Sequence, residues 1–418
     1  MIGWKAKRHM PVDINGVEGP ATAKGGADSA SAMKIGINLG AEITVSGKSF
    51  AREIQYFHLV QPINDHHRLT IGLHRVGDQS GETISVDDLS GILGKPITLK
   101  TASANQQIPN EKLLSFTGTV TEVRFESSVD QFGEAIIVAK SPTVLLDGAP
   151  KNRVFEILKA SEAISKVIGQ YKVTAGTIDA TQSQFPYIIQ YHETDFDFVV
   201  RLAALHGLYT IYDGSSITCI APDNSKSSET VKWNEMLGAF SLQLGTGPFR
   251  YSSASYNAAT GKLYVSDEQA VRMNRSLGNL PSKSEKASKE IYEGMGVSDV
   301  GMTAHEQALL DGYMKWERGH NLAQMVRCVG QASLPAIRPG TKLKVEGLDG
   351  IADVYFVEHV EHFISGGKYY NTFSGTPLAT AYPRPRRLPA PQPELQTAVV
   401  TNVDDPEKLG RKIGRAHV

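Results

Sequence analysis

The sequence predicts an α+β protein that is mainly β. Two stretches, residues 33–150 and 237–380, carry apolar side chains at every second position between turn residues, which is typical of half-buried antiparallel strands. Between them, residues 151–236 change to the three-to-four spacing of an amphipathic helix. A length of 418 residues suits about three domains. We therefore expect two strand-rich domains with an α+β domain between them.

The chain opens with residues 1–32, which are rich in Gly, Ala and Ser and show no apolar period. We expect a mobile arm there. The alternating pattern begins at residue 33, and short strands that form a β-barrel or a sandwich account best for the sequence up to residue 150.

In the middle region, a first helix is predicted from six apolar residues on one face: Val154, Ile157, Leu158, Ile164, Val167 and Ile168. A second helix is predicted after Thr194, a good N-terminal cap, with Asp195 and Asp197 in its first turn and Gly207 beyond its C-terminus. A hairpin over residues 208–220 should follow it.

Strands resume from residue 237, and Thr303 with Glu306 predicts a capped helix that runs to Met325. After this helix, three more strands are predicted, at residues 341–345, 354–363 and 368–373. The prolines of residues 381–396 predict a stiff, extended linker.

The two strand-rich regions share a short pattern. Residues 94–99 followed by Val120 parallel residues 340–345 followed by Val357, and each valine has a second valine three positions later. The repeat predicts an internal duplication of one β domain. Coincidence is the alternative, because valines three apart are common in strands.

Composition limits the function. A formal net charge of −1 does not favour a nucleic-acid partner. No apolar run approaches the ~18 residues that a membrane-spanning helix needs, and we expect no conventional signal peptide. Cys219 and Cys328 predict neither a disulfide framework nor a metal cluster, and Cys219 lies in an apolar strand where an inert thiol is expected.

Two groups of residues invite a catalytic or metal-binding interpretation. Glu193, Asp195 and Asp197 could be the carboxylates of a glycosidase. Acids at a helix start usually stabilise the helix. We therefore expect replacement of Glu193 or Asp195 by Ala to lower the stability by about 0.5–2 kcal/mol without abolishing any catalysis. His359 and His362 lie three apart on a strand and so point to opposite faces. We predict no catalytic residue, no cofactor and no metal.

Four segments in a fixed order carry a resemblance to a known family. The first runs over residues 190–212 and includes Tyr191, Glu193, Asp195, Phe198, Leu202, Gly207 and Tyr209. The others are residues 330–340, which end in Pro339 and Gly340, residues 359–373, which contain Gly366 and Gly367, and residues 399–411. Together they resemble the VgrG family of type VI secretion system spikes and the related hub proteins of contractile phage tails.

The resemblance implies two β-barrel hub domains with a helical α+β insert, followed by the start of an OB-fold at residues 397–412. It implies a structural protein, not an enzyme, which assembles as a homotrimer and adapts a hexameric tube protein to a spike. Baseplate proteins are further implied partners, and the full-length protein would carry a needle-tip protein and effectors. Assembly in the bacterial cytoplasm and export by the contractile machine are implied as well.

The last residues invite a separate interpretation. Residues 413–418 read as the translation of a widely used sequencing-library adapter, so we expect the natural chain to continue past residue 412. A strand that begins near Thr397 should then have no partner strand in the residues present.

Two alternatives stay open. A secretion-system spike and the hub of a phage or prophage tail are not separated by one sequence; neighbouring genes would separate them. A secreted β-rich hydrolase or glycan-binding protein is the rival from another class, and it rests only on the β pattern and scattered carboxylates. A signal peptide or a clustered aromatic groove would favour that rival.

Overall fold

The structure is a computed structural model of the chain. It describes residues 37–49, 54–74, 86–103, 108–128, 131–258, 260–267, 276–298, 304–384, 386, 398–405, 408, 410 and 413–416. These residues belong to one compact unit, Ile35–Val418. The predicted N-terminal arm lies outside the described residues.

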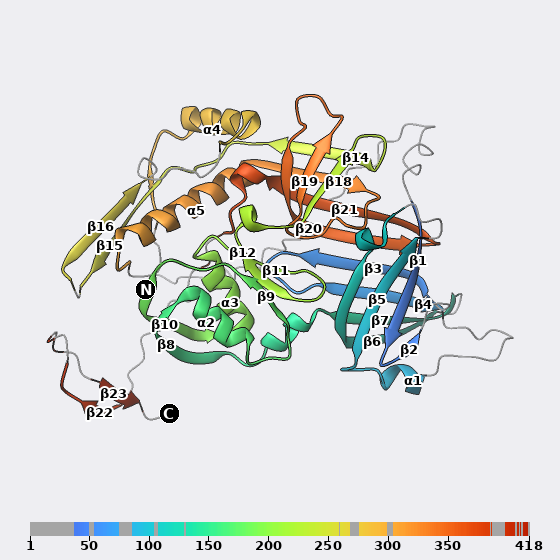
Figure 1. Cartoon of the computed structure of the whole chain (residues 1–418), viewed down its shortest axis with the longest axis horizontal. Helices are drawn as coiled ribbons and strands as arrows, with labels where there is room; N and C mark the ends of the chain where they lie inside the picture. Colours follow the sequence, from blue (N-terminus) through green and yellow to red (C-terminus); the bar gives the residue numbers. More distant parts are fainter. Residues whose placement is uncertain are drawn as a thin grey trace, which may run out of the picture. The chain divides into compact units, whose positions relative to one another are not determined.

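A first barrel is formed by strands from both ends of this unit (Figure 1). Its strands are Ile37–Val45 (β1), Ile54–Pro62 (β3), Arg68–His74 (β4), Pro96–Ser103 (β5), Ser115–Ser128 (β6), Gln131–Lys140 (β7), Val354–Ser365 (β20) and Lys368–Pro377 (β21). Each pairs antiparallel with the next in the order β20, β3, β4, β7, β6, β5, β1, β21, and β21 pairs back onto β20. The barrel is therefore closed, and fully buried residues such as Ile43, Leu59 and Phe116 fill its core.

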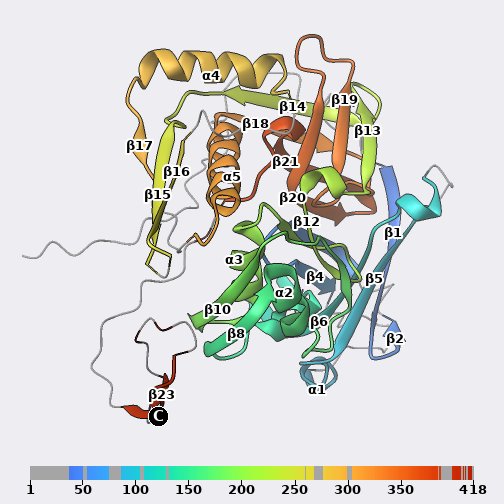
Figure 2. The same cartoon turned by 60° about the vertical axis from the view of Figure 1, so that its left-hand side comes forward.

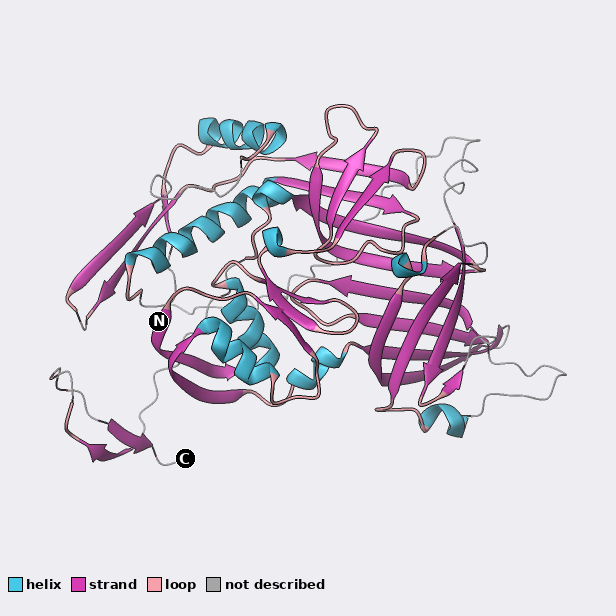
Figure 3. Ribbon diagram, in the orientation of Figure 1, coloured by secondary structure: helices cyan, strands magenta, loops and turns pink. Residues whose placement is uncertain are grey.

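The β20–β21 hairpin, called the shared hairpin below, also builds a second barrel-like sheet (Figure 3). The base of the hairpin forms strand pairs with Val326–Ala332 (β18) on one side and Lys342–Glu346 (β19) on the other. Leu237–Leu244 (β14) pairs with β18, and Ser228–Lys232 (β13) pairs with β19, so these two strands extend the sheet. The tip of the hairpin lies between β3 and β1 of the first barrel. Val360 and Phe373 accordingly belong to the core of the second sheet, whereas Ile364 and Tyr369 belong to the first.

The two sheets repeat one topology. The strands of the second sheet are labelled in Figure 2. The first contains the order β3-β4-β7-β6-β5 and the second the order β14-β18-β21-β20-β19. In both, the first strand along the chain pairs with the second, the second with the fifth, the fifth with the fourth and the fourth with the third. The internal duplication predicted from the short sequence pattern is thus confirmed.

The α+β insert lies between the two repeats in sequence. It contains a two-stranded sheet of Lys151–Lys159 (β8) and Gln184–Glu193 (β10), and a three-stranded sheet of Ala175–Ile178 (β9), Tyr209–Tyr212 (β11) and Ile217–Ile220 (β12). Its helices are Ala160–Ile168 (α2) and Asp195–Ala204 (α3). They pack together around a core that includes Ile164, Val167, Phe198 and Leu202. The predicted second helix and the hairpin after it are confirmed.

The first predicted helix begins later than expected. Val154, Ile157 and Leu158 belong to strand β8, and the helix starts only at Ala160. Val154 and Ile157 are 59% and 67% exposed, so they form no buried helix face. Ile157 has a positive φ of 51°, which interrupts the alternation of faces along the strand. The apolar residues of β8 therefore have the spacing of a helix although they lie in a strand.

A second insertion separates β14 from β18, where the first repeat has only a short turn between β3 and β4. It holds Tyr251–Asn257 (β15), Lys262–Asp267 (β16), Gly296–Val297 (β17), Asn279–Ile291 (α4) and Gln307–Met325 (α5). Residues 304–306 are not helical, so the predicted start of α5 at Thr303 is wrong. Glu306 is its N-cap residue, and the Glu306 carboxylate accepts a hydrogen bond from Ser183 rather than closing a capping box.

The smaller elements are Lys48–Ser49 (β2), which pairs with β1, and the short helix Val86–Ser90 (α1). Near the end of the chain, Ala398–Asn402 (β22) pairs antiparallel with Ile413–Ala416 (β23). The prediction that the strand near residue 397 lacks a partner is therefore wrong. Ala381 and Tyr382 are buried, so close packing extends into the first residues of the predicted linker.

Candidate functional site

The first family segment crosses from β10 through α3 into β11. Thr194 caps the helix as predicted, because its Oγ1 accepts a hydrogen bond from the backbone N–H of Asp197 at 3.1 Å. Asp195 and Glu193, on either side of the cap, point into the insert and are almost completely buried. The cap thus places two carboxylates beneath the protein surface.

Asp195 is surrounded by donors. One carboxylate oxygen accepts from Lys151 Nζ at 2.8 Å and Tyr171 Oη at 2.5 Å, and the other from Gln190 Nε2 at 2.8 Å and from Arg153. Burial alone would raise the pKa of Asp195, but the hydrogen bonds from Lys151, Tyr171 and Gln190 lower it below its ordinary value. Asp195 is therefore held as a carboxylate whose lone pairs are already used.

Glu193, at the end of β10, forms a second buried pair with Arg201 in the last turn of α3. Arg201 Nη2 donates to Glu193 Oε1 at 2.6 Å, and Arg201 Nε donates to Oε2 at 2.9 Å. Arg201 Nη2 also donates to the carbonyl of Ile189 on β10 at 3.0 Å. A bidentate pair of this kind fixes the helix against the strand that precedes it. Glu193, Asp195, Lys151, Arg153 and Arg201 are called the charged cluster below.

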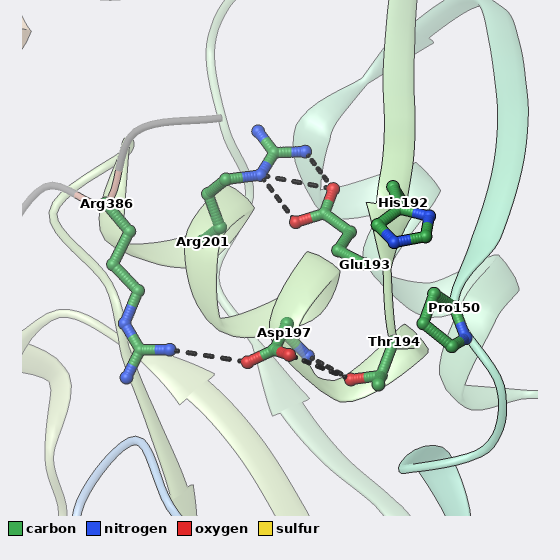
Figure 4. Close-up of a pocket in the computed structure, with 7 residues that line it drawn as sticks. All are labelled: Pro150, His192, Glu193, Thr194, Asp197, Arg201 and Arg386. Carbon is green, nitrogen blue, oxygen red and sulfur yellow. Dashed lines mark hydrogen bonds and ion pairs between the residues drawn. The ribbon is translucent and has the colours of Figure 1, made fainter. Parts of the chain in front are cut away.

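A shallow pocket of about 300 Å³ opens beside this cluster (Figure 4). It is lined by Pro150, His192, Glu193, Thr194, Asp197, Arg201 and Arg386. Arg386 Nη1 lies 3.7 Å from Asp197 Oδ1 across its mouth, and both side chains are about half exposed. Such an exposed pair contributes little stability. Glu193 faces Arg201, so the pocket offers no unpaired buried carboxylate for acid–base chemistry.

The remaining residues of this segment are structural in position. Phe198 and Leu202 lie in the insert core, and Tyr191 is half-buried on β10. Gly207 ends α3 with a positive φ of 71°, and a Cβ there would lie 2.3 Å from Trp316 Nε1 of α5. Both constraints require glycine.

Tyr209 attaches the insert to the shared hairpin. Its ring stacks on Phe356 of β20 with centroids 5.0 Å apart, and its hydroxyl donates to Glu358 Oε1 at 3.2 Å. Glu358 also accepts from Arg327 of β18 at 2.9 Å. One tyrosine thus links the insert to two strands of the second sheet.

The other predicted motif residues form turns of the sheets. Gly340, after Pro339, has a φ of 83°, and a Cβ there would approach Ile211 Cδ1 to 2.7 Å. Gly366 and Gly367, with φ of 57° and 73°, form the two-residue tip of the shared hairpin. Two consecutive positive φ angles are what a type I′ turn requires.

The turn at Gly340 repeats the turn at Gly94. Gly94 N donates to Val120 O at 2.9 Å and Val120 N to Lys95 O at 3.0 Å. In the second repeat, Gly340 N donates to Val357 O at 2.8 Å and Val357 N to Thr341 O at 3.0 Å. Both glycines have positive φ, and a register shift follows each valine. The duplication therefore extends to single hydrogen bonds.

The two histidines of β20 and Cys219 were the other residues considered for metal binding or catalysis. His359 and His362 lie on opposite faces of β20, since His359 bonds Glu361 near the surface and His362 is buried. Cys219 is buried, and burial raises the pKa of its thiol to about 12. Within the described parts of the chain, no group of three His, Cys, Asp or Glu side chains has the geometry of a metal site.

Sequence reasoning missed the cations of the charged cluster. Lys151 and Arg153 come from β8, which the sequence assigned to a helix, so their approach to Asp195 was not foreseen. Arg201 carried a usable signal, because an arginine between Val200 and Leu202 on an apolar helix face needs a buried partner. Glu193, eight residues earlier, is that partner.

None of the described helices is long and apolar enough to span a membrane. No curated protein sequence matches the chain. Among solved structures, a prophage MuSo2 43 kDa tail protein from Shewanella oneidensis aligns with a TM-score of 0.56 at 11% identity, covering 81% of this chain and 98% of that one. A tail protein from Neisseria meningitidis gives 0.55 at 11% identity, with coverage of 81% and 96%.

A third similar structure is an Escherichia coli protein described as a component of the type VI secretion system. It aligns with a TM-score of 0.55 at 14% identity and covers 86% of this chain and 84% of its own length. At these identities the similarity establishes the fold. The family model of the phage tail baseplate hub (GPD) matches residues 63–367, which is more than half of the sequence. The chain belongs to the phage tail baseplate hub family.

Proposed function

We propose that three copies of this chain form a ring that adapts the spike of an injection machine to its hexameric tube. The duplicated sheet carries this proposal: a threefold ring of chains with two repeats each presents six related modules. The matching hydrogen bonds at Gly94 and Gly340 support a close equivalence of the repeats. Membership of the baseplate hub family agrees with a structural role.

The family residues in this proposal hold the chain together and do not act on a substrate. They are Tyr191, Glu193, Asp195, Phe198, Leu202, Gly207, Tyr209, Pro339, Gly340, Gly366 and Gly367. The two acids support this role most directly, because both are ion-paired and nearly inaccessible to solvent.

Further partners follow from the same role. Baseplate proteins would contact the ring from outside, and a needle-tip protein and effectors would be carried by the full-length spike. Export by the machine itself would need no signal peptide. Both phage tails and the type VI secretion system contain proteins of this fold, so the genes beside this one decide between them. A membrane complex that anchors the sheath accompanies only the secretion system.

Native mass spectrometry of the chain mixed with rings of the tube protein tests the adaptor role. We expect three chains on each six-membered ring. Six chains per ring, one chain per ring or no binding would each overturn the proposal. The chain alone and the ring alone are the controls, and they separate self-assembly from assembly on the ring.

The structural role of the acids has its own test. We expect the purified chain not to cleave peptidoglycan. Cleavage that is lost in the Glu193→Gln variant, while the melting temperature stays unchanged, would show that the acid is catalytic.

A further inference from the structure

A continuous row of polar side chains crosses the interior where the tip of the shared hairpin meets β3. It consists of His67, Gln61, His362, Tyr369 and Asn371, called the histidine network below. Each of these residues is at most 1% exposed. His67 lies just before β4, Gln61 on β3, His362 on β20, and the last two on β21. The row therefore joins both strands of the hairpin to the first barrel.

The hydrogen bonds of this network all run in one direction. Asn371 Nδ2 donates to Tyr369 Oη at 2.8 Å, and Tyr369 Oη donates to His362 Nδ1 at 2.7 Å. His362 Nε2 then donates to Gln61 Oε1 at 2.9 Å, and Gln61 Nε2 donates to His67 Nδ1 at 3.2 Å. The Gln61 oxygen can only accept and its nitrogen only donate, so His362 carries a proton on Nε2 and His67 accepts at Nδ1. With Tyr369 donating to His362 Nδ1, both histidines are neutral and the row is continuous.

An additional proton has no place in this arrangement. On His67 Nδ1 it would face the amide group of Gln61, which is itself a donor there. On His362 Nδ1 it would take the lone pair that accepts from Tyr369 Oη, so the Tyr369 hydroxyl would lose the acceptor for its proton. At the far end, His67 Nε2 is buried, and the Pro62 carbonyl beside this ring offsets only part of the cost of charging it. Burial lowers the pKa of His67 and of His362 to about 3.

The charged and titratable groups that face the network do not offset this penalty. Asp213 and the Pro62 carbonyl raise the pKa of His67, but His66 and His359 lower it. Arg338, His67 and His58 all lower the pKa of His362. On the outer face of β20, the Glu361 carboxylate is already bonded to His58 at 2.8 Å and His359 at 3.0 Å.

We propose that the histidine network is an acid-sensitive latch that holds the tip of the shared hairpin in the first barrel at neutral pH. Proton uptake breaks the directed row and frees the tip, while the base of the hairpin stays in the second sheet. The folded state takes up these protons less readily than the unfolded state does. The closed state is therefore fully stable above about pH 6.5 and loses stability as the pH falls. For each histidine, opening becomes about tenfold more favourable for each pH unit below 6.5.

Hydrogen exchange read by mass spectrometry, corrected for the intrinsic pH dependence of exchange, tests the latch on the whole chain. Between pH 7.5 and 5.0 we expect protection to fall in β3 and in the tip, residues 359–370, and to persist in β18 and β19. An equal loss in the tip, β3, β18 and β19 would overturn the proposal, because acid would then unfold the protein globally.

The His67→Asn variant sharpens this test, since an asparagine oxygen can take the acceptor position of Nδ1 and does not titrate. We expect its loss of protection at pH 5.0 to be about 30-fold smaller than that of the unaltered chain. His192→Asn is the matched control: His192 is exposed, and its φ of 47° suits asparagine. A loss in His67→Asn equal to that of the control would contradict the latch.

If His67→Asn does not fold, nitrogen NMR of the histidine rings in the unaltered chain tests the latch instead. The latch requires His67 and His362 to stay neutral at pH 5.5, with the proton of His362 on Nε2. Protonation of either ring at pH 6 would overturn it.

Discussion

The charged cluster of the insert and the histidine network of the shared hairpin are both buried, but their polar groups are satisfied in opposite ways. In the cluster, each carboxylate has a cation as its partner, and the pKa of Asp195 is lowered. In the network no group is charged, and each polar group is satisfied by a hydrogen bond to the next one in the row. One fold can thus satisfy buried polar groups either by pairing charges or by excluding them. The first solution fails when a partner is removed, and the second fails when a proton is added.

Glu193→Ala should have the largest effect. It leaves the buried Arg201 guanidinium without its carboxylate, and loss of one partner of a buried pair costs about 3–5 kcal/mol. Urea denaturation measures this cost. It exceeds the 0.5–2 kcal/mol expected from helix-start interactions, because Glu193 pairs with a buried arginine. In the double variant with Arg201→Met, the loss should be clearly smaller; an equal or greater loss would contradict the pairing.

Asp195→Asn should cost less, about 1.5–3 kcal/mol, through weaker hydrogen bonds to Lys151 and Arg153. Both cations are partly exposed and can turn to water. The folded pKa of Asp195 is lowered, so its contribution is present above about pH 4 and is lost as the pH falls further. The stability difference from the unaltered chain should therefore stay constant from pH 8 to 5. A difference that already shrinks at pH 6 would show that another group is responsible.

Tyr369→Phe breaks the histidine network without touching a charge. It removes the donor to His362 Nδ1 and the acceptor for Asn371, so we expect a loss of about 1–2 kcal/mol. Tyr370→Phe, next to it on the exposed side, is the matched control and should be nearly neutral in thermal denaturation. Equal melting temperatures for the two variants would mean that the network does not stabilise the hairpin.

Thr194→Ala should have the smallest effect, about 1 kcal/mol, because it removes the helix cap and otherwise only exposed hydrogen bonds from the hydroxyl to Asp147 and Asp197. Thr194→Ser keeps the hydroxyl and should behave like the unaltered chain. A loss above about 3 kcal/mol would show that the cap also positions the charged cluster beside it.

Local signals predicted much of the fold. Thr194 and Gly207 marked both ends of α3, because capping oxygens and left-handed glycines act within a few residues. The duplication was visible at Gly94 and Gly340 for the same reason: each glycine is required by a turn whose geometry is local. Strands such as β20 were predicted from alternation, which reflects two faces with different surroundings.

The misses depend on contacts that are distant in sequence. The carboxylate of Glu306 is bonded to Ser183, which no local pattern at residue 303 can indicate. Strand β8 exposes Val154 and Ile157, so its apolar spacing said nothing about burial. In the charged cluster, Arg153 and Asp195 meet because β8 pairs with β10. Pairing of that kind is set by the tertiary structure.

The shared hairpin also sets the order of events during synthesis. The strands of the first barrel up to β7 are translated by residue 140, but their closing strands begin only at Val354. On the ribosome, the nascent chain must therefore hold β3 and β1 with open edges until residues 354–377 have been made. Such edges are sites of aggregation, and closure between distant segments is slow. The first barrel therefore cannot close before both strands of the shared hairpin have left the ribosome, and its open edges must be kept apart from other chains until then.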